Sequence, residues 1–301
     1  MNAPGPTSPR TYRSGLVALA GRPNVGKSTL ANALAGSQVA AVSPRPQTTR
    51  RRITAVVHGD GWQAVMLDLP GFQRPADGLT ARMQSTVDRS LVDCDAALLV
   101  LNAAEPVGGG DRFIAERLRA SRLPTIVVVN QVDRLPADEI AAAIARAAPL
   151  VDFVALHPVS ARTGDGLAAL REDLPSLLPE GPRYFPEGMA TDQTEDELAA
   201  ELIREAALLR LRQEIPHALA VEIHEIEPAR QGVVVRAGLL VETESQKGIV
   251  VGRGGGMIRD IGSAARSALG RLWGTEVHLD LTVRVRRRWR DDESMLSRLG
   301  L

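Results

Sequence analysis

The chain has few of the residues that stabilise small secreted proteins or let a protein span a membrane. Its single cysteine, Cys94, cannot form an intramolecular disulfide, and neither a disulfide framework nor a cysteine zinc site is available. We expect Cys94 to pack as a small hydrophobic residue rather than act as a nucleophile. No apolar run reaches the roughly 18 residues that a membrane-spanning helix needs, and the polar, proline-rich residues 1–10 lack the apolar stretch of a secretory signal. We therefore expect a cytoplasmic protein.

An excess of one charge is also absent. The 36 Lys and Arg residues balance the 36 Asp and Glu residues, which removes any argument for a nucleic-acid partner from overall basicity. Positive charge is nevertheless concentrated at residues 50–52, three consecutive arginines, and at residues 284–290. Residues 50–52 could contact RNA, a switch segment or solvent, and the sequence does not rank these alternatives. At 301 residues the chain has room for about two domains.

Apolar strand-like runs alternate with helix-like stretches through the first half of the chain. Runs that are apolar on both faces and separated by helices predict a parallel sheet covered by helices. We therefore predict a doubly wound α/β domain over residues 13–178, preceded by a flexible tail at residues 1–12. The strand-like runs are residues 16–20, 64–67, 96–101, 124–129 and 153–156, and the helix-like stretches are residues 79–91, 111–120, 136–148 and 166–174.

The second half of the chain predicts a smaller domain behind a linker. Residues 179–193 are rich in proline and glycine, which exclude a helix or a central strand. Thr194 and Glu197 then form a capping box that begins an amphipathic helix, and Pro216 marks where this helix has ended. Two strands joined by a turn, a glycine loop, a helix and a last strand complete a compact α+β domain over residues 194–301. The strands are predicted at residues 220–226, 232–241 and 276–285, and the helix at residues 257–272.

Residues 21–28 read Gly-Arg-Pro-Asn-Val-Gly-Lys-Ser and follow a strand-like run directly. This spacing is typical of a phosphate-binding loop, in which backbone N–H groups turn toward the phosphates, Lys27 reaches the outer phosphates and the Ser28 hydroxyl holds Mg²⁺. The following helix points its positive N-terminal end at the phosphates. The sequence therefore predicts a site for a nucleoside triphosphate. Its expected contacts are Gly21, Arg22, Pro23, Asn24, Val25, Gly26, Lys27, Ser28 and Thr29.

A second segment, Asp68-Leu69-Pro70-Gly71, follows another strand-like run. In this position Asp68 can bind Mg²⁺ through water, and the Gly71 N–H can meet the γ-phosphate. The same residues also make an ordinary turn, but their place after a phosphate-binding loop favours a site that detects the third phosphate. We include Leu69, Pro70 and the next residue, Phe72, among the nucleotide contacts.

A third segment, Asn130-Gln131-Val132-Asp133, follows the strand-like run at 124–129, at the sheet edge where doubly wound folds bind ligands. The carboxylate of Asp133 can accept hydrogen bonds from the ring N–H and amino group of guanine. Adenine presents an acceptor there instead, and unsatisfied buried acceptors cost several factors of ten in affinity. The segment therefore predicts guanine selection, with Asn130, Gln131 and Asp133 at the base. The further run Ser160-Ala161-Arg162 follows the next strand-like run and can offer backbone N–H groups to the guanine carbonyl, with Ser160 and Ala161 among the expected contacts.

A glycine loop lies between two helix-like stretches of the second domain, at residues 252–255. Its G-x-x-G pattern allows a nucleic-acid backbone to approach the main chain, and apolar neighbours can form a groove for unstacked bases. With the surrounding strands and helices, the segment looks like a type II KH RNA-binding domain. The arginine run at 284–290, which carries Trp289, reads as a strand end whose guanidinium groups meet phosphates or stack on bases. The expected RNA contacts are Ile249, Val250, Gly252, Arg253, Gly254, Gly255, Ile258, Arg259, Arg286 and Arg288.

The nucleotide segments resemble those of translation-factor-like GTPases, and Pro-Gln-Thr-Thr-Arg at residues 46–50 narrows the resemblance to the Era family of bacterial ribosome-assembly GTPases. The resemblance covers about residues 14–299. It implies that Thr49, or alternatively Thr48, is the switch threonine that meets Mg²⁺ with Ser28 and Asp68. It also implies that Lys27, Thr49 and Gly71 carry the catalysis of GTP hydrolysis to GDP and phosphate.

Three residues depart from what GTPases often carry. Leu69 replaces a threonine, and Gln131 replaces a lysine whose stem covers the guanine ring, so nucleotide affinity is expected to fall while Asp133 keeps specificity. Phe72 stands where many small GTPases have a glutamine that orients water, and it cannot polarise water. The resemblance implies that another element positions the attacking water, and Asn24 is a candidate ligand for an activating K⁺. We expect slow intrinsic hydrolysis.

The family resemblance also implies partners. They are small-subunit ribosomal RNA near its 3′ end, the 30S subunit, and the inner face of the cell membrane as a peripheral contact; we expect a monomer. The favoured reading is a switch in which GTP and Mg²⁺ order the segments around Thr49 and Gly71 and change how the second domain is held for RNA. One competing hypothesis is an RNA-binding scaffold that binds GTP or GDP but hydrolyses poorly. Another is a GTPase serving an RNA-modifying enzyme, although the chain has no catalytic cysteine or cofactor domain of its own.

Overall fold

The computed structural model describes residues 11–43, 45, 47–71, 76–212 and 215–301. By their contacts these residues form two compact units. The first unit contains the residues up to Ser37, Thr54–Asp68 and Asp88–Asp192, and the second contains Gln38–Ile53, Leu69–Val87 and Gln193–Leu301. Two segments that precede the predicted linker therefore belong to the second unit. Most of the predicted tail, residues 1–10, lies outside the described residues.

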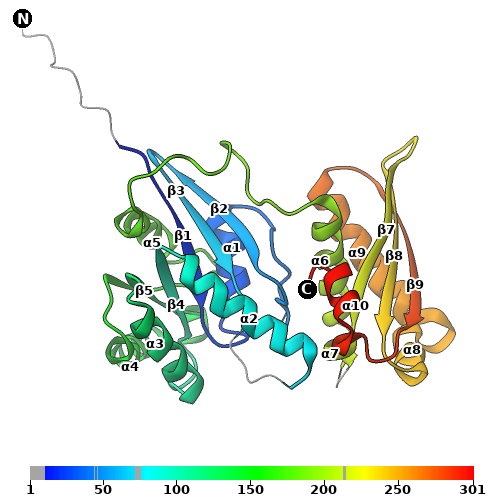
Figure 1. Ribbon diagram of the computed structural model, residues 1–301, viewed down its shortest axis with the longest axis horizontal. Coiled ribbons are helices and arrows are strands. Elements are labelled where there is room, and N and C mark those ends of the chain that lie inside the picture. The colour runs from blue at the N-terminus through cyan, green and yellow to red at the C-terminus, as the bar shows by residue number, and fades with distance from the viewer. Residues whose placement is uncertain (1–10, 44, 46, 72–75, 213–214) are drawn as a thin grey trace, which may run out of the picture. The chain divides into compact units, whose positions relative to one another are not determined.

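The first unit is an α/β fold, as predicted, with helices on both faces of its sheet (Figure 1). The predicted helix-like stretches all form helices, because each carries an apolar stripe that the sheet can bury. Helix α2 (Gly78–Asp93) has residues in both units. The other elements are β1 (Arg13–Ala20), α1 (Lys27–Ala35), β2 (Ile53–Gly59), β3 (Trp62–Asp68), β4 (Ala96–Asn102), α3 (Gly109–Ser121), β5 (Thr125–Asn130), η1 (Val132–Arg134), α4 (Ala137–Ala147), η2 (Ala148–Leu150), β6 (Ala155–Pro158), α5 (Leu167–Asp173) and η3 (Leu174–Leu177).

The six-stranded sheet has the order β2-β3-β1-β4-β5-β6. Strand β1 pairs in parallel with β3 and with β4, and the parallel pairing continues from β4 to β5 and from β5 to β6. The register places Asp68 beside Leu19 and Asn130 beside Asn102. The carboxyl ends of the parallel strands therefore meet at one edge of the sheet, which is where the predicted nucleotide segments begin.

Strand β2 is missing from the predicted strand-like runs. It is joined to its sheet neighbour β3 by only Asp60 and Gly61, and a connection of two residues permits antiparallel pairing alone. Gly61 has φ 76°, a left-handed conformation that glycine adopts without strain. The prediction of an all-parallel sheet was therefore wrong at this edge. The physical reason is that β2 is a hairpin partner rather than a crossover strand.

The predicted linker is held along the first unit. The Ser14 N–H donates to the Pro179 carbonyl, and the Val56 N–H donates to the Ala190 carbonyl. The side-chain oxygen of Gln63 accepts from the N–H groups of Tyr184 and Phe185. These bonds satisfy backbone groups of a proline-rich segment that forms no helix or long strand.

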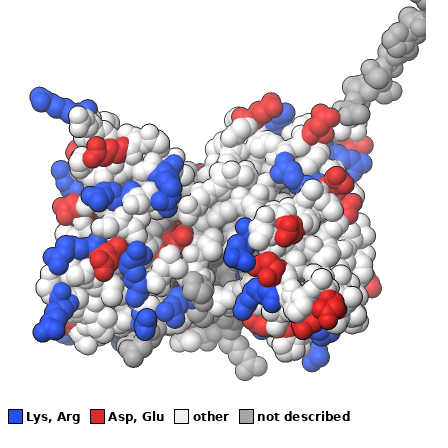
Figure 2. Space-filling view, turned by 180° about the vertical axis from the view of Figure 1, so that it is seen from behind, with Lys and Arg blue, Asp and Glu red and all other residues white. Residues whose placement is uncertain are grey.

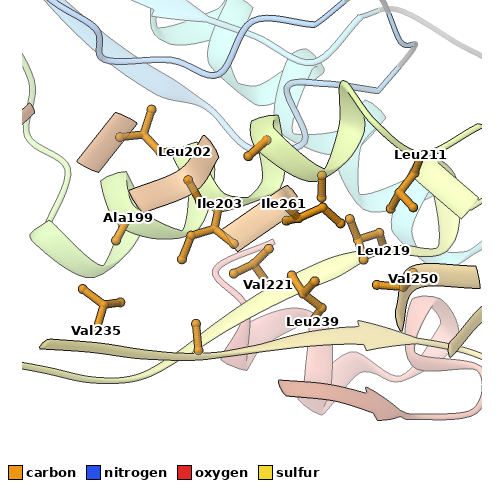
Figure 3. Packing of buried hydrophobic residues seen from close by; sticks show 14 of the residues in the cluster. Ala199, Leu202, Ile203, Leu211, Leu219, Val221, Val235, Leu239, Val250 and Ile261 are labelled. Carbon is orange, nitrogen blue, oxygen red and sulfur yellow. The ribbon is translucent and has the colours of Figure 1, made fainter. Parts of the chain in front are cut away.

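The second unit contains a three-stranded sheet of order β7-β8-β9. Strands β7 and β8 pair antiparallel, and β8 and β9 pair in parallel. A hydrophobic core joins the buried faces of α6 and α9 to one face of the sheet (Figure 3). The elements are α6 (Glu195–Leu208), α7 (Ile215–Ala218), β7 (Ala220–Pro228), β8 (Val233–Val241), α8 (Glu244–Val251), η4 (Arg253–Gly255), α9 (Gly256–Trp273), β9 (Val277–Val285), η5 (Trp289–Asp291) and α10 (Glu293–Arg298).

Local sequence signals predicted this unit well. The capping box of Thr194 and Glu197 is present at the start of α6, with the Thr194 side chain accepting from the Glu197 N–H. Pro216 does lie beyond α6, but it sits inside the short helix α7. Strand β9 ends at Val285, where the sequence predicted, and the arginine run begins in its last residues and turns into η5.

The segment Gln38–Ile53 is bound to α6 within the second unit. Carboxylate groups repeat along one face of α6 at Glu197, Glu201 and Glu205. Glu197 pairs with Arg51 at 2.8 Å, and Glu205 Oε2 accepts from the Val42 N–H at 3.1 Å. Because these positions are four residues apart, one helix face holds successive parts of the segment.

Arg50 is the most deeply buried of the three consecutive arginines. Its guanidinium donates to the carbonyl groups of Leu219 at 2.6 Å, Pro216 at 2.9 Å and His217 at 3.0 Å, and it lies over the Trp289 ring. These contacts resolve the open question for Arg50, whose role here is a structural one.

Among the described residues, every helix is too short or too polar to cross a lipid bilayer.

Candidate nucleotide site and RNA-binding loop

The phosphate-binding loop connects β1 to α1, as its sequence predicts. Gly26 stands at the start of α1 with φ 94°, and a Cβ there would lie 2.3 Å from Nδ2 of Asn130. A Cβ on Gly21 would lie 2.5 Å from the carbonyl oxygen of Val100. Both positions therefore require glycine, the first for its backbone conformation and both for lack of space. Asn24 also adopts a left-handed backbone, with φ 66°.

Lys27 and Ser28 are placed by the first turn of α1. The Lys27 ammonium group is buried and donates to the carbonyl groups of Gly21 at 3.0 Å and Arg22 at 3.1 Å. Burial lowers the pKa of Lys27, and the charge of Asp68 opposes that shift. The ammonium group is thereby held inside the loop that surrounds it.

Ser28 and Asp68 supply a pair of hard oxygen ligands. The Ser28 hydroxyl donates to Oδ2 of Asp68 at 2.6 Å, and Asp68 is fully buried at the end of β3. A hydroxyl and a carboxylate fit Mg²⁺, which keeps several waters and binds through few protein ligands. In the described part of the chain no cluster of three or more His, Cys, Asp or Glu residues could hold a metal by itself. The pair therefore fits a cation that also binds phosphate.

Asn130 forms hydrogen bonds to two other segments of the predicted nucleotide site. Its Nδ2 donates to the Val25 carbonyl at 2.9 Å, and its Oδ1 accepts from the Ala161 N–H at 3.0 Å. Asn130 thus connects the phosphate-binding loop with the loop after β6. The Ala161 N–H, which we predicted at the guanine carbonyl, has Asn130 as its acceptor here.

Asp133 lies in η1, directly after β5, and two side chains hold its carboxylate. Ser160 donates to Oδ1 at 2.6 Å, and Arg162 donates to Oδ2 through Nε at 3.0 Å and Nη2 at 2.6 Å. The Ser160 hydrogen bond lowers the pKa of Asp133, as do the hydrogen bonds and charge of Arg162. The carboxylate is therefore kept ionised, which is the form that accepts two hydrogen bonds from a base.

Gln131 keeps one contact to the phosphate-binding loop without a charge. Its Nε2 donates to the Asn24 carbonyl at 2.9 Å, and its Oε1 accepts from Arg134 at 2.7 Å. The base segment and the phosphate segment are therefore joined at two points, by Asn130 and by Gln131. Gln131, which stands where a lysine is usual, therefore still connects the base segment to the phosphate-binding loop.

The side chain of Arg22 forms ion pairs with acidic residues of the first unit. Its Nε pairs with Asp111 at 2.8 Å and its Nη2 with Glu105 at 3.0 Å. Asp111 is buried in the first turn of α3 and also accepts from the Gly108 N–H. The Arg22 side chain therefore anchors the phosphate-binding loop to α3, and only its main chain is left to contact phosphates. Sequence reasoning missed Asp111 and Glu105, which have no local motif.

The remaining nucleotide contacts of the prediction belong to the second unit or are not described. Thr48 and Thr49 are buried in the second unit, where the Thr48 carbonyl accepts from Arg204. Leu69, which is buried, belongs to that unit with its neighbours Pro70 and Gly71. Phe72 lies outside the described residues. The roles of Thr49 and Gly71 in catalysis stay predictions.

The glycine loop of the second unit runs from the end of α8 through η4 into α9. Gly252, Gly254 and Gly255 all have positive φ, of 74°, 58° and 76°. A Cβ on Gly252 would lie 2.6 Å from Cβ of Met257, whereas one on Gly254 would meet nothing within 4 Å. Arg253 and Arg259 are exposed beside this open point. Figure 2 shows basic side chains, with acidic ones between them, over the face of the second unit around α8 and α9.

One predicted RNA contact, Val250, needs correction. Ile249 is 43% exposed and Ile258 is partly exposed, but Val250 is fully buried in the core and cannot line a groove for bases. Trp289, the aromatic residue of the arginine run, is also fully buried, and its Nε1 donates to the Ala218 carbonyl at 2.9 Å. Both are apolar side chains that the unit requires for its core.

The arginines near the chain's end differ in their exposure. Arg288 is 86% exposed and lies 3.8 Å from Asp291, while Arg286 is 55% exposed and lies 3.2 Å from Asp292. Arg290 instead pairs with Glu242 and Asp77. Arg290 is therefore the least available arginine of this run, whereas Arg284, Arg286, Arg287 and Arg288 are exposed and can meet phosphate.

Two family models match the chain. One, described as 50S ribosome-binding GTPase, matches residues 16–131, and the other, a KH domain, matches residues 214–290. The first covers the phosphate-binding loop and ends at Asn130 and Gln131. The second covers the glycine loop, β7 to β9 and Arg290.

Full-length relatives match both halves together. The chain is 46% identical over 297 residues to GTPase Era of Mycobacterium tuberculosis, covering 96% of this chain and 99% of that protein, and 45% identical over 295 residues to GTPase Era of Mycobacterium avium. A crystal structure of Era in complex with MgGDPNP and nucleotides 1506–1542 of 16S ribosomal RNA matches with a TM-score of 0.90 and 34% identity, covering 96% of this chain and 99% of that one. These likenesses extend over nearly the whole sequence, and the chain belongs to the Era family of GTPases.

Proposed function

We propose that this protein is a GTP-hydrolysing switch that binds small-subunit ribosomal RNA near its 3′ end and assists assembly of the 30S subunit. The nucleotide half of the proposal depends on one observation above others. Asp133 presents an ionised carboxylate that Ser160 holds, and Asn130 ties the same region to the phosphate-binding loop. Guanine offers two N–H groups to such a carboxylate, whereas adenine offers an acceptor. A related Era has been crystallised with MgGDPNP, which supports the assignment.

The remaining roles follow from the chemistry of each group. Lys27 stabilises negative charge on the outer phosphates, and the N–H groups of the loop around it do the same. Ser28 and Asp68 hold Mg²⁺, which neutralises charge that develops during phosphoryl transfer. Thr49 completes the metal site when GTP is bound, and Gly71 meets the γ-phosphate through its N–H. Catalysis here consists of positioning and charge stabilisation, since none of these side chains forms a covalent intermediate.

Substitution of the base-selecting carboxylate tests the nucleotide assignment. An amide at position 133 can donate one hydrogen bond and accept another, which matches the ring N–H and the C2 carbonyl of xanthine rather than the amino group of guanine. We expect Asp133→Asn to lose GDP affinity by at least about a hundredfold and to prefer XDP. Calorimetric titration of both proteins with GDP, XDP and ADP measures this. Binding of ADP in preference to GDP by the unsubstituted protein would refute the proposal.

The attacking water needs a group other than Phe72, whose side chain has no polar atom. We propose K⁺ bound near Asn24 as the activator, because a cation there can add positive charge beside the phosphates. Hydrolysis is then expected to be faster in potassium than in sodium at equal ionic strength. Equal phosphate release rates in the two salts would remove K⁺ from the mechanism.

RNA is proposed to bind along the glycine loop between α8 and α9. Gly254 offers an open approach to the main chain, and the exposed Arg253 and Arg259 provide charge for phosphates. Ile249 gives an exposed apolar edge. A related Era bound to nucleotides 1506–1542 of 16S ribosomal RNA supports this class of ligand. Crosslinking and sequencing of RNA bound in GTP and in GDP tests both the ligand and the switch, because equal capture in the two states would defeat the switch.

A second candidate function is an RNA-binding scaffold whose nucleotide site binds GTP or GDP with little hydrolysis. The neutral Gln131 and the apolar Phe72 favour it, because both replace groups that assist nucleotide binding or water activation in many GTPases. Phosphate release measured with and without small ribosomal subunits separates the two functions. Release that stays at the background rate in both would favour the scaffold.

The proposed location is the cytoplasm, with part of the protein at the inner face of the cell membrane, and the proposed state is a monomer. These proposals depend on the family resemblance. Fractionation of cells into cytosol and membranes tests the location, and light scattering of the purified protein tests the monomer.

A further inference from the structure

The two oxygens of the Asp133 carboxylate are engaged by different kinds of donor. Oδ1 accepts from the buried Ser160, whose hydroxyl also accepts from the Thr163 N–H. Oδ2 accepts both bonds from Arg162, whose side chain is 74% exposed while that of Asp133 is 10% exposed. A carboxylate oxygen has about two acceptor positions in its plane. Arg162 therefore uses the capacity of Oδ2, while Oδ1 keeps room for one more donor.

Guanine needs both oxygens of this carboxylate. Its ring N–H and its amino group lie side by side, so each donates to a different oxygen, as in a bidentate contact. One of these donors must go to Oδ2, where Arg162 already supplies two. Guanine and the full set of Arg162 bonds therefore exclude each other.

We propose that Arg162 is a gate on guanine recognition, which holds Oδ2 of Asp133 and must release it before the base can bind. The proposal rests on the proposed function in one respect, namely that Asp133 reads guanine. In the unbound protein Arg162 orients the Asp133 carboxylate and favours its ionised form. It also lowers the fraction of molecules that can accept the base. Any entering base must outcompete two N–H donors.

The exposure of Arg162 makes this release feasible. The guanidinium of Arg162 is already largely solvated, so water can replace Asp133 around it, and salt screens this exposed partner of the pair. Arg162 lies in the loop between β6 and α5, which contains Gly164 and Gly166, both at positive φ. Ser160, by contrast, is fully buried and stays in place. One donor is thus fixed, and the other is exchangeable.

The gate predicts a change in association rather than in dissociation. When only a fraction of molecules is competent to bind, the apparent dissociation constant rises by the inverse of that fraction. Removal of Arg162 should therefore raise the association rate constant for GDP by about twofold or more, because the pair with Asp133 is exposed on the Arg162 side only. The dissociation rate constant should change little, because Arg162 has already left Asp133 in the bound state.

Stopped-flow binding of a fluorescent GDP analogue to the full chain measures both rate constants. The variants are Arg162→Ala and Arg162→Gln, the second of which keeps a polar side chain and guards against a folding defect in the first. Arg134→Ala is the matched control, because Arg134 is an exposed arginine of the same site that donates to Gln131 at 2.7 Å and not to Asp133. It removes the same charge without opening the carboxylate, so its association rate should not rise.

A second measurement uses salt. Because the pair of Arg162 with Asp133 is screened, the ratio of association rate constants between Arg162→Ala and the unsubstituted protein should fall toward one as sodium chloride is raised. The ratio cancels the salt effect that both proteins share through the phosphates.

The outcomes separate the gate from the proposed function. Faster association with unchanged dissociation in both Arg162 variants, but not in Arg134→Ala, supports the gate. Unchanged association overturns it, and faster dissociation overturns it in favour of Arg162 as a direct contact of the bound base. Failure of the unsubstituted protein to bind GDP, or a preference for ADP, would instead defeat the guanine assignment itself.

Discussion

The Ser28 hydroxyl donates a hydrogen bond of 2.6 Å to Oδ2 of Asp68, which joins the first turn of α1 to the end of β3. The two residues come from segments that are forty positions apart, and parallel pairing of β1 with β3 brings them together. Both groups are hard oxygen ligands, and their contact fixes the orientation of the hydroxyl. The pairing of β1 with β3 therefore fixes the relative position of the two candidate Mg²⁺ ligands, Ser28 and Asp68.

This pair leads to a prediction for magnesium. Replacement of Ser28 by Ala removes one oxygen ligand and should raise the Mg²⁺ concentration needed for half-maximal GTP binding by about tenfold or more. Ser28→Thr keeps the hydroxyl and should bind Mg²⁺ nearly as the unsubstituted protein does. Titration of nucleotide fluorescence with Mg²⁺ measures the effect, with Ser121→Ala as a control at an exposed serine. Equal midpoints for Ser28→Ala and the control would exclude Ser28 from the metal site.

The glycine loop offers a pair of substitutions that separate folding from RNA binding. Gly252 has φ 74° and ψ 171°, a region open almost only to glycine, and a Cβ there would overlap Met257. Gly254 has φ 58° and ψ 25°, and open space surrounds it. We expect Gly252→Ala to lower the free energy of unfolding by more than the roughly 1–2 kcal/mol that the left-handed backbone costs Gly254→Ala.

RNA affinity should be lowered by the substitution that harms folding less, Gly254→Ala. A methyl group on Gly254 stands where the nucleic-acid backbone is proposed to approach, so Gly254→Ala should weaken binding of a 16S 3′-end fragment by about tenfold while the fold remains. Fluorescence anisotropy with the labelled fragment measures this, and far-ultraviolet circular dichroism checks the fold. An unchanged affinity in Gly254→Ala would place the RNA elsewhere on the unit.

Motifs whose meaning is local were predictable from the sequence. The phosphate-binding loop requires glycine at Gly26 for reasons of backbone conformation, and the capping box of Thr194 and Glu197 spans a single helical turn. In both, the residues that interact are neighbours in the chain, so spacing alone identifies them. The parallel strands were also predictable, because burial on both faces leaves an uninterrupted apolar run.

Residues whose role depends on distant partners were not predictable in the same way. Trp289 and Val250 lie in segments that read as RNA-binding, and only the packed core shows that both are buried. Arg162 belongs to a recognised segment, but the pairing of its side chain with Asp133 requires β5 and β6 to be neighbours in the sheet. Sequence patterns report which residues can be buried or charged, whereas contacts between elements depend on how the chain folds.

Arg50 and Arg52 provide another matched test. Arg50 donates to three carbonyl groups around α7, and Arg52 is exposed. Arg50→Ala leaves buried acceptors without a donor and should lower the free energy of unfolding by about 3 kcal/mol. Arg52→Ala should change it by less than about 0.5 kcal/mol. Urea unfolding followed by tryptophan fluorescence measures both, and equal midpoints would show that Arg50 does not anchor its segment.

The carboxylate of Glu205 should make stability depend on pH. Burial raises the pKa of Glu205 above its ordinary value, although its hydrogen bonds from Val42 and Gln38 and the charge of Arg204 oppose the shift. In the window between the ordinary and the raised pKa, the folded protein binds more protons than the unfolded chain. Stability contributed by this group therefore falls as pH rises through that window.

A neutral side chain removes this dependence. Glu205→Gln keeps an oxygen that can accept from the Val42 N–H, which lies 3.1 Å from the Glu205 carboxylate, but it does not titrate. The stability of Glu205→Gln minus that of the unsubstituted protein should therefore increase as pH rises from about 4 to 7, since only the unsubstituted protein has to ionise a buried group. Urea midpoints at several pH values measure the difference. Glu195→Gln, at an exposed position of the same helix, should give a difference that does not rise in this way. A constant difference for Glu205→Gln across the range would mean that Glu205 ionises as freely in the folded protein as in the unfolded chain.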